Sequence, residues 1–281
     1  MLKEISLGHY YFEIASLLRE TLFMNAFLWN METWYNIRKS DYEEIEKIDR
    51  ILIKRILGVP SSTPSALLYL ELGLVPLKYI IQARRLTFLR YILSRKEDDL
   101  LLKFFMAQMR EPSKNDWCQT VKDDLQEFQI ELNFDQIKSL SKLKWKKIVQ
   151  KAMRTKAFDD LIEKQTNYLK GEDLSYGKLE IRTYLLSKNI NTSQKNLIFK
   201  IRTNMINVKS NYSHSYIEFS CPCCKIEEDT QEHMLTTCQS ITSKLTQKEY
   251  RAIFSQNENE IEKIAGKVEA IEAERHSILS S

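Results

Sequence analysis

The chain has 281 residues, of which 43% are hydrophobic and 28% are charged, so it can bury the core of one or two ordinary domains. This composition excludes a disordered chain. The net charge is only +4, which by itself gives weak support for nucleic-acid binding. Gly and Pro are scarce, at six and five residues, and this favours a mainly α-helical fold over a β-sandwich or a Gly-rich dinucleotide-binding fold.

Membrane insertion and secretion are not expected. The richest N-terminal apolar run is interrupted by Glu13, Arg19 and Glu20, so it falls short of the roughly 18 apolar residues that a spanning helix needs. The first residues also lack the pattern of a secretory signal. We therefore expect a nuclear or cytoplasmic protein with no membrane partner. In that setting the four cysteines between Cys221 and Cys238 predict reduced, metal-binding thiols rather than disulfides.

Apolar residues at helical spacing predict helices throughout the first part of the chain. The expected helical stretches are residues 5–37 as one long or two short helices, 40–57 from a capping box onward, a short helix ending near 73, 76–93 and 100–109. Gly58 ends the second of these, and Pro112 breaks the pattern after the last. We place a domain boundary at that break.

The middle of the chain carries a concentrated positive charge. Between positions 138 and 156 there are eight basic residues and no acidic one: Lys138, Lys142, Lys144, Lys146, Lys147, Lys151, Arg154 and Lys156. An apolar stripe and Trp145 lie within the same run, which predicts a basic amphipathic helix. Shorter helices are expected at 179–186 and 194–205. From Asn257 onward the pattern predicts an exposed, Glu-rich helix that frays at its end.

The most specific motif is Cys221-x2-Cys224-x8-His233-x4-Cys238. Two thiols separated by two residues can hold one ion from a tight turn, and a later His and Cys can complete a tetrahedron. This pattern predicts a structural zinc site with no open position for water. His233 and Cys238 are more than one α-turn apart, so the helix between them is expected to end or distort. Cys223 either replaces Cys224 as a ligand or stays free, and a coincidental group of cysteines is the alternative to a metal site.

The basic residues form the second candidate site. Lys and Arg release counterions when they contact phosphates, and an exposed aromatic ring can stack on an unpaired base. The predicted nucleic-acid contacts are Arg84, Arg85, Lys142, Lys144, Trp145, Lys146 and Lys147. Each has an ordinary alternative, because Trp145 can belong to the core and the cations can simply face solvent.

No catalytic residue is predicted. The acidic pairs Asp98-Asp99, Asp123-Asp124 and Asp159-Asp160 lie in charged helical stretches that suit solvation better than metal binding. The sequence contains no Gly-rich phosphate loop, nucleophile elbow or His-Glu-x-x-His motif. An enzymatic activity of this chain therefore stays uncertain.

Several blocks of the sequence resemble one protein family in the same order. The blocks are residues 22–35, 48–57, 62–64, 68–73, 84–93, 114–117, 219–224 and 229–233. Together they are similar to the region that follows the polymerase palm in jockey-like non-LTR retrotransposon reverse transcriptases, which are RNA-directed DNA polymerases. The resemblance extends from Ile5 to about Cys238.

The resemblance implies a thumb and a helical linker that hold a template-primer duplex, followed by a Cys-Cys-His-Cys element implicated in nucleic-acid binding. It assigns the metal to Cys221, Cys224, His233 and Cys238. The palm, with its magnesium-binding Asp pair, would lie upstream of Met1. We therefore expect a fragment of a transposable-element protein that does not polymerise DNA by itself and that can have the missing polymerase domains as partners.

The expected organisation has four consecutive segments. Residues 1–110 form a thumb-like helical region, 111–210 a basic helical connector, 211–245 the zinc knuckle and 246–281 a polar helical tail. The expected function is binding of RNA, DNA or both through the basic helices and the zinc knuckle. The alternatives are a protein–protein interaction module and a functionless truncated relic.

Overall fold

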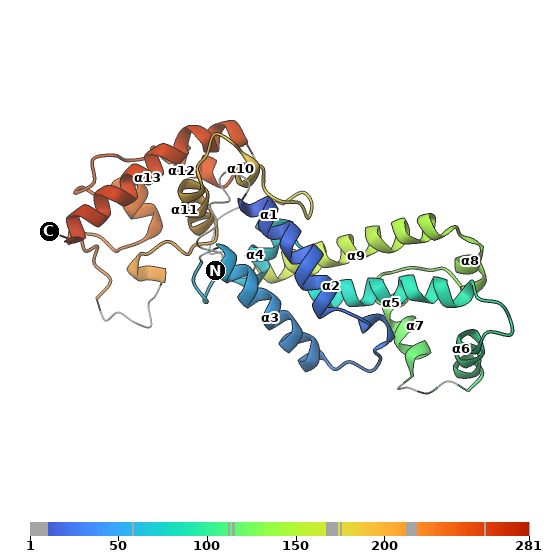
Figure 1. Ribbon diagram of the computed structural model, residues 1–281. Coiled ribbons are helices and arrows are strands. Elements are labelled where there is room, and N and C mark those ends of the chain that lie inside the picture. The colour runs from blue at the N-terminus through green and yellow to red at the C-terminus, as the bar shows by residue number, and fades with distance from the viewer. Residues whose placement is uncertain are drawn as a thin grey trace. The chain divides into compact units, whose positions relative to one another are not determined.

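The computed structural model of the protein describes residues 11–57, 59–111, 113, 116–166, 174, 176–211, 218–255 and 257–280. Helices dominate these ranges, and the only extended pairing within them is two isolated β-bridges, so the expected mainly α-helical fold is confirmed (Figure 1). No single described helix is long and apolar enough to cross a membrane; the bent pair Ser65–Leu72 and Leu77–Leu93 meets that test jointly, by length and composition alone. The predicted breaks at Gly58 and Pro112, residues 5–10 of the first predicted helix, and Lys114 and Asn115 of one resemblance block lie outside the described residues.

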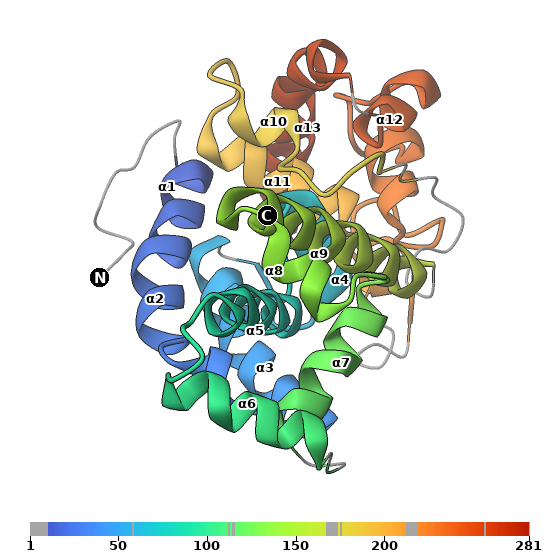
Figure 2. The same ribbon diagram turned by 90° about the vertical axis from the view of Figure 1, so that its right-hand side faces the viewer.

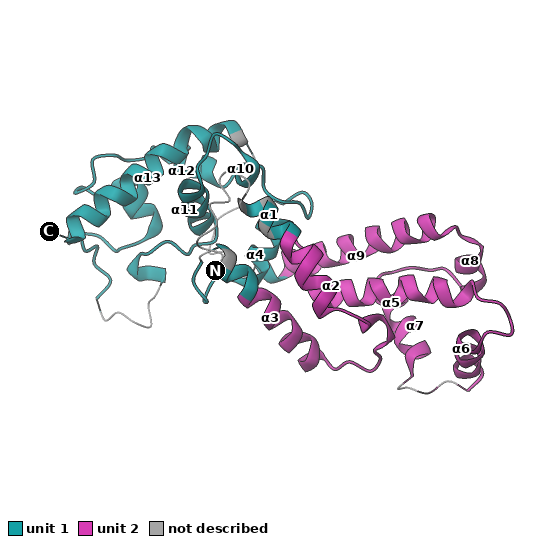
Figure 3. Cartoon of the chain, viewed as in Figure 1, with its two compact units in different colours: residues 1–17, 52–73, 164–281 teal, residues 18–51, 74–163 magenta. Residues whose placement is uncertain are grey.

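The chain folds into two compact units, each assembled from separated stretches (Figure 3). Unit 1 contains residues 1–17, 52–73 and 164–281, and unit 2 contains residues 18–51 and 74–163. The unit boundaries do not follow the four consecutive segments expected from composition. Composition records local changes along the chain, whereas these units depend on contacts between distant stretches.

Unit 2 carries the basic run. Its elements are η3 (Arg19–Phe23), α2 (Met24–Phe27), η4 (Met31–Thr33), the first part of α3 (Lys39–Leu57), α5 (Leu77–Leu93), α6 (Leu100–Arg110), α7 (Trp117–Glu127), α8 (Phe134–Ser139) and α9 (Lys142–Gln165). The predicted basic helix is α9, which continues beyond the basic run. Long helices are stabilised mainly by packing of one apolar face, and α9 buries such a face at Val149, Ala157 and Leu161.

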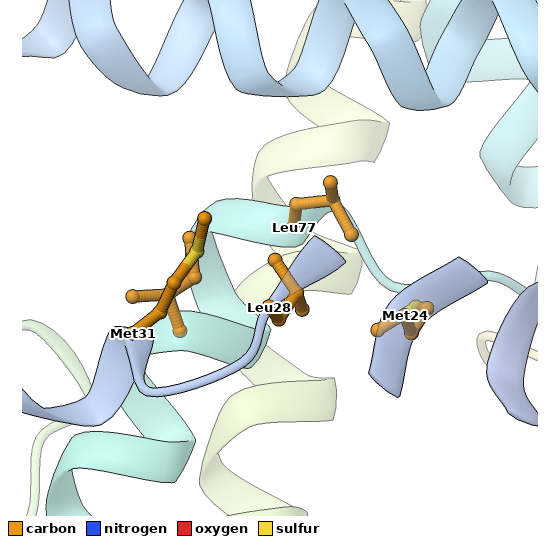
Figure 4. Packing of buried hydrophobic residues seen from close by; sticks show 5 residues of the cluster. Met24, Leu28, Met31 and Leu77 are labelled. Carbon is orange, nitrogen blue, oxygen red and sulfur yellow. The ribbon is translucent and has the colours of Figure 1, made fainter. Parts of the chain in front are cut away.

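The core of unit 2 joins the start of α5 to the preceding segments. Met24, Leu28, Met31, Leu77 and Ile81 form one buried cluster, four of whose side chains are labelled in Figure 4. Methionine adapts its shape to irregular gaps, which suits a contact between a short helix, a turn and a long helix. The cluster fixes η4 against α5 and so defines one border of the cavity described below.

Unit 1 contains α1 (Tyr11–Leu18) up to residue 17, the end of α3, α4 (Ser65–Leu72), α10 (Thr183–Leu186), α11 (Thr192–Arg202), η6 (His233–Thr237), α12 (Gln247–Ile253) and α13 (Glu258–Ser280). The expectation that the last helix is exposed was wrong. Ile261, Ile264, Val268 and Ile271 of α13 are buried, and the helix packs on α10, α11 and α12. Its polar composition belongs to the outer face of an amphipathic helix.

A buried carboxylate connects the helices of unit 1. Glu71 of α4 has no exposed side-chain surface and accepts hydrogen bonds from the hydroxyl groups of Tyr176 at 2.6 Å and Tyr184 at 2.9 Å. Arg202 of α11 donates from Nε to both Glu71 oxygens at 3.0 Å. The Arg202 Nη1 atom also donates to the carbonyl oxygens of Ile253 and Ser255. One ion pair thus positions α4, α11 and the end of α12.

Gly73 closes α4 where the chain meets residues 180–182. Its φ is +63°, and a Cβ at this position would lie 2.3 Å from the backbone carbon of Glu180. We expect Gly73→Ala to lower the free energy of unfolding by at least about 2 kcal/mol, because both the left-handed backbone and the close approach exclude a side chain. Urea unfolding measures this, with Gly266→Ala as the control. Gly266 lies in α13 with no atom within 4 Å of an added Cβ, so its replacement should stabilise the chain by up to about 1 kcal/mol. Equal effects at the two positions would contradict the prediction.

Candidate metal centre

The structure brings together all four predicted metal ligands. The thiol sulfurs of Cys221, Cys224 and Cys238 and a ring nitrogen of His233 all lie within 4.8 Å of one another. The Sγ atoms of Cys221 and Cys238 are 3.8 Å apart, and the Sγ of Cys224 is 3.3 Å from Nε2 of His233. All three cysteines are free thiols. The cluster can therefore hold a metal ion.

A tight turn positions the first two thiols. The backbone N–H of Cys221 donates to the carbonyl oxygen of Glu227 at 2.7 Å, and the N–H of Lys225 donates to the carbonyl oxygen of Cys221 at 2.9 Å. Lys225 adopts a left-handed φ of +62°, which reverses the chain directly after Cys224. A β-bridge between Ser220 and Glu228 closes the turn. Cys221 and Cys224 are thereby held on the same side of the turn.

A widened helical turn positions the other two ligands. Residues 233–237 form the π-helical turn η6, and the N–H of Cys238 donates to the carbonyl oxygen of His233 at 2.8 Å. A π-turn closes over five residues, so His233 and Cys238 come to the same side, whereas an ordinary α-turn would separate them. The expected distortion before Cys238 is this π-turn.

His233 is oriented by hydrogen bonds at its other ring nitrogen. Nδ1 lies 2.9 Å from a carboxylate oxygen of Glu227 and 3.0 Å from the hydroxyl of Thr237, while Nε2 faces the thiols. A carboxylate on the far nitrogen fixes the tautomer and ring orientation of metal-binding histidines. Sequence reasoning missed Glu227, because nothing in its spacing distinguishes it from the neighbouring Glu228.

We expect Glu227→Gln to weaken metal affinity about 10- to 100-fold, because the amide is a poorer acceptor for the His233 N–H. The neighbouring variant Glu228→Gln removes the same charge from an exposed side chain and should leave the affinity within about twofold. Competition with a chromophoric chelator measures both constants. Identical losses in the two variants would show that only the local charge matters.

The thiols differ in their electrostatic surroundings. Desolvation acts to raise the pKa of Cys224, but hydrogen bonds from the backbone N–H groups of Glu227 and Ile226 prevail and lower it to about 6. Burial raises the pKa of Cys238 to about 12. Cys223 lies outside the four-ligand cluster, so the geometry selects Cys224 of the two alternatives. Burial raises the pKa of the Cys223 thiol.

The metal cluster is anchored to α13. Arg275 of α13 donates to both carboxylate oxygens of Asp229 at 2.9 and 2.8 Å, and both side chains are buried. Asp229 also accepts a hydrogen bond from the backbone N–H of Lys209. On the other side of η6, Glu274 accepts from the N–H groups of Thr242 and Ser243. The cluster is therefore built into the fold of unit 1 rather than attached as a separate module.

Two of the predicted nucleic-acid contacts are buried. Arg85 has no exposed surface and pairs with Asp124 at 2.9 Å. Trp145 is 1% exposed, and its indole N–H donates to the carbonyl oxygen of Leu86 at 2.7 Å. The prediction that these two side chains touch nucleic acid is corrected: Arg85 neutralises a buried carboxylate, and Trp145 belongs to the core between α5 and α9.

The remaining predicted contacts fall into two groups. Lys144 and Lys147 are exposed and share one face of α9 with Lys151. Arg84, Lys142 and Lys146 instead line a cavity of about 610 Å³ in unit 2. Their guanidinium and ammonium groups thus belong to different surfaces, which the linear sequence does not separate.

The fold and the geometry of both regions can be set beside known proteins. The chain matches no family model, no curated protein and no solved structure. The interpretation of the metal cluster and of the basic residues therefore rests on their own geometry and chemistry.

Proposed function

We propose that this protein binds nucleic acid through the exposed lysines of α9 and that Cys221, Cys224, His233 and Cys238 hold a structural zinc ion. The observation that carries the proposal is the tetrahedral geometry of the thiol and imidazole cluster. The family resemblance supports the same reading, in which the chain is a fragment of a retrotransposon reverse transcriptase without its polymerase palm.

Zinc fits the distances within the cluster. A tetrahedral zinc ion with Zn–S bonds of about 2.3 Å has S–S edges of about 3.8 Å, and a mixed S–N edge of about 3.6 Å follows from a Zn–N bond of about 2.0 Å. The corresponding distances are 3.8 Å for Cys221–Cys238 and 3.3 Å for Cys224–His233. Three soft thiolates and one imidazole also match the donor preference of zinc over magnesium or calcium.

The donor set favours a structural ion over a catalytic one. Four protein ligands fill a tetrahedron and leave no position for a water molecule. Cys221 and Cys238 have no exposed surface, and His233 is 4% exposed, so substrate has little access to the ion. In this proposal the bound metal supplies folding free energy to the region around η6.

The exposed lysines of α9 provide the contact with phosphates. Lys144, Lys147 and Lys151 are three and four residues apart, so their side chains form one stripe. None of them forms an ion pair with a carboxylate of the described residues. Uncompensated cations attract phosphates and release their counterions on binding.

We expect the triple variant Lys144→Glu, Lys147→Glu, Lys151→Glu to reduce RNA affinity by at least about tenfold at low salt and to flatten its salt dependence, by up to about 0.7 per phosphate contact for a single strand. Fluorescence anisotropy across a salt series measures both effects. The control is Lys96→Glu, Lys103→Glu, which reverses two exposed charges away from α9. Undiminished RNA affinity in the triple variant would exclude the α9 stripe as the binding surface.

A further inference from the structure

We propose that the cavity between α5 and α9 is a docking groove for an acidic amphipathic helix of a partner protein. The groove is distinct from the lysine stripe of α9 and from the metal cluster. It is carried by three features of unit 2: its length along two helices, its apolar floor and its uncompensated positive rim.

The groove follows two antiparallel helices. α5 and α9 run side by side in both views (Figures 1 and 2), and they are joined by hydrogen bonds from Trp145 to Leu86 and from Arg90 to Leu140 at the start of α9. The lining extends from Lys142 to Met153 on α9, which is about 16 Å at a rise of about 1.5 Å per residue. A third helix of about three turns has this length.

The floor of the groove is apolar. Ile80, Phe88, Trp145, Val149 and Met153 contribute to its lining. Its volume of about 610 Å³ far exceeds the packing voids of a protein interior and falls within the range of binding cavities. An amphipathic helix fills such a groove with residues at i, i+3, i+4 and i+7. A methionine in the floor can adapt to the side chains that enter.

The rim of the groove is positively charged. Arg84, Arg90, Lys142 and Lys146 line it, against Glu32 as the single acidic side chain of the lining. Within the described part of the chain, none of these four cations is ion-paired to a carboxylate.

The two arginines of the rim are held in place by neutral partners. Arg84 donates to the carbonyl oxygen of Leu28 at 2.8 Å, and Arg90 donates to that of Leu140. These bonds fix the guanidinium groups without cancelling their charge. An acidic partner therefore complements the rim, whereas a basic one is repelled.

An apolar floor below a cationic rim favours a peptide helix over a nucleic-acid strand. A nucleic acid presents a continuous line of phosphates, whereas only the border of this groove carries cations. A helix with leucines on one face and glutamates beside them presents both chemistries at the required positions. Lys142 and Lys146 lie on one face of α9, and Lys144 and Lys147 lie on another, so the groove and the lysine stripe can be tested separately.

The test uses the full chain and a fluorescent synthetic helix of about sixteen residues with leucines on one face and glutamates flanking them. The groove variant is Lys142→Glu, Lys146→Glu, and the matched control is Lys144→Glu, Lys147→Glu on the same helix. All four side chains are exposed, and circular dichroism verifies that both variants keep their helices.

We expect the peptide to bind the unmodified chain, to bind the groove variant at least about tenfold more weakly and to bind the control variant within about twofold. A peptide with lysines in place of the glutamates should prefer the groove variant. Tyr91→Ala, at the rim of the floor, should also weaken binding. Absence of binding to the unmodified chain, or equal losses in the two double variants, would overturn the proposal. Displacement of the peptide by oligothymidylate would assign the groove to nucleic acid instead.

Discussion

Removal of the metal is expected to unfold the region around η6 and to cost on the order of 10 kcal/mol, the scale of binding free energy at structural zinc sites. The reason is the burial of the ligands. Cys221, Cys238 and His233 are almost completely inaccessible, and without an ion the cluster leaves thiol and imidazole groups close together with little else to hold them. The buried Arg275–Asp229 pair should transmit the loss to the C-terminal part of α13.

Cys221→Ser, Cys224→Ser should reproduce the effect of a chelator, whereas Cys223→Ser should not. Cys223 lies in the same turn but outside the ligand cluster, so it is a matched control. Hydrogen exchange of residues 218–245 and of α13, measured with and without chelator, reports the unfolding directly. Unchanged exchange after metal removal would mean that the cluster is stable as free thiols and does not depend on an ion.

The second large effect is expected at the buried ion pair of unit 1. Arg202→Met should lower the free energy of unfolding by about 3 to 5 kcal/mol, because it leaves the carboxylate of Glu71 buried with no opposite charge. Glu71 keeps only the hydroxyl groups of Tyr176 and Tyr184 as partners in that variant. The exposed Arg251 on α12 provides the control, since Arg251→Met should change stability by less than about 0.5 kcal/mol.

A double variant separates the pair from its surroundings. Glu71→Leu, Arg202→Met removes both charges, so it should recover part of the stability that Arg202→Met loses. Denaturant titration monitored by circular dichroism gives all the free energies required. If the double variant is less stable than Arg202→Met by the full cost of Glu71→Leu, then the two residues act independently and the interpretation of a coupled pair is wrong.

Much of the fold and the metal cluster could be predicted because their signals are local. Helical periodicity marked α5 and α9, and the spacing of Cys221, Cys224, His233 and Cys238 follows directly from what one tetrahedral ion requires. The distortion before Cys238 was predictable because five residues exceed one α-turn.

What could not be predicted depends on contacts between distant residues. Arg84 and Arg85 are adjacent in sequence, yet Arg84 lines the groove while Arg85 is buried against Asp124. The role of Glu227 depends on a turn that brings its carboxylate to His233. The polar composition of α13 hid its buried face, because a narrow stripe of Ile and Val is enough to pack it.

The most direct test of the central claim measures metal content together with RNA affinity across a salt series, on the purified chain and on Cys221→Ser, Cys224→Ser. We expect one zinc ion per chain, an RNA affinity that falls steeply with salt, and a loss of zinc with weakened affinity in the variant. A chain that carries no zinc when purified under reducing conditions, or that shows no affinity for structured RNA at low salt, would contradict the proposed function.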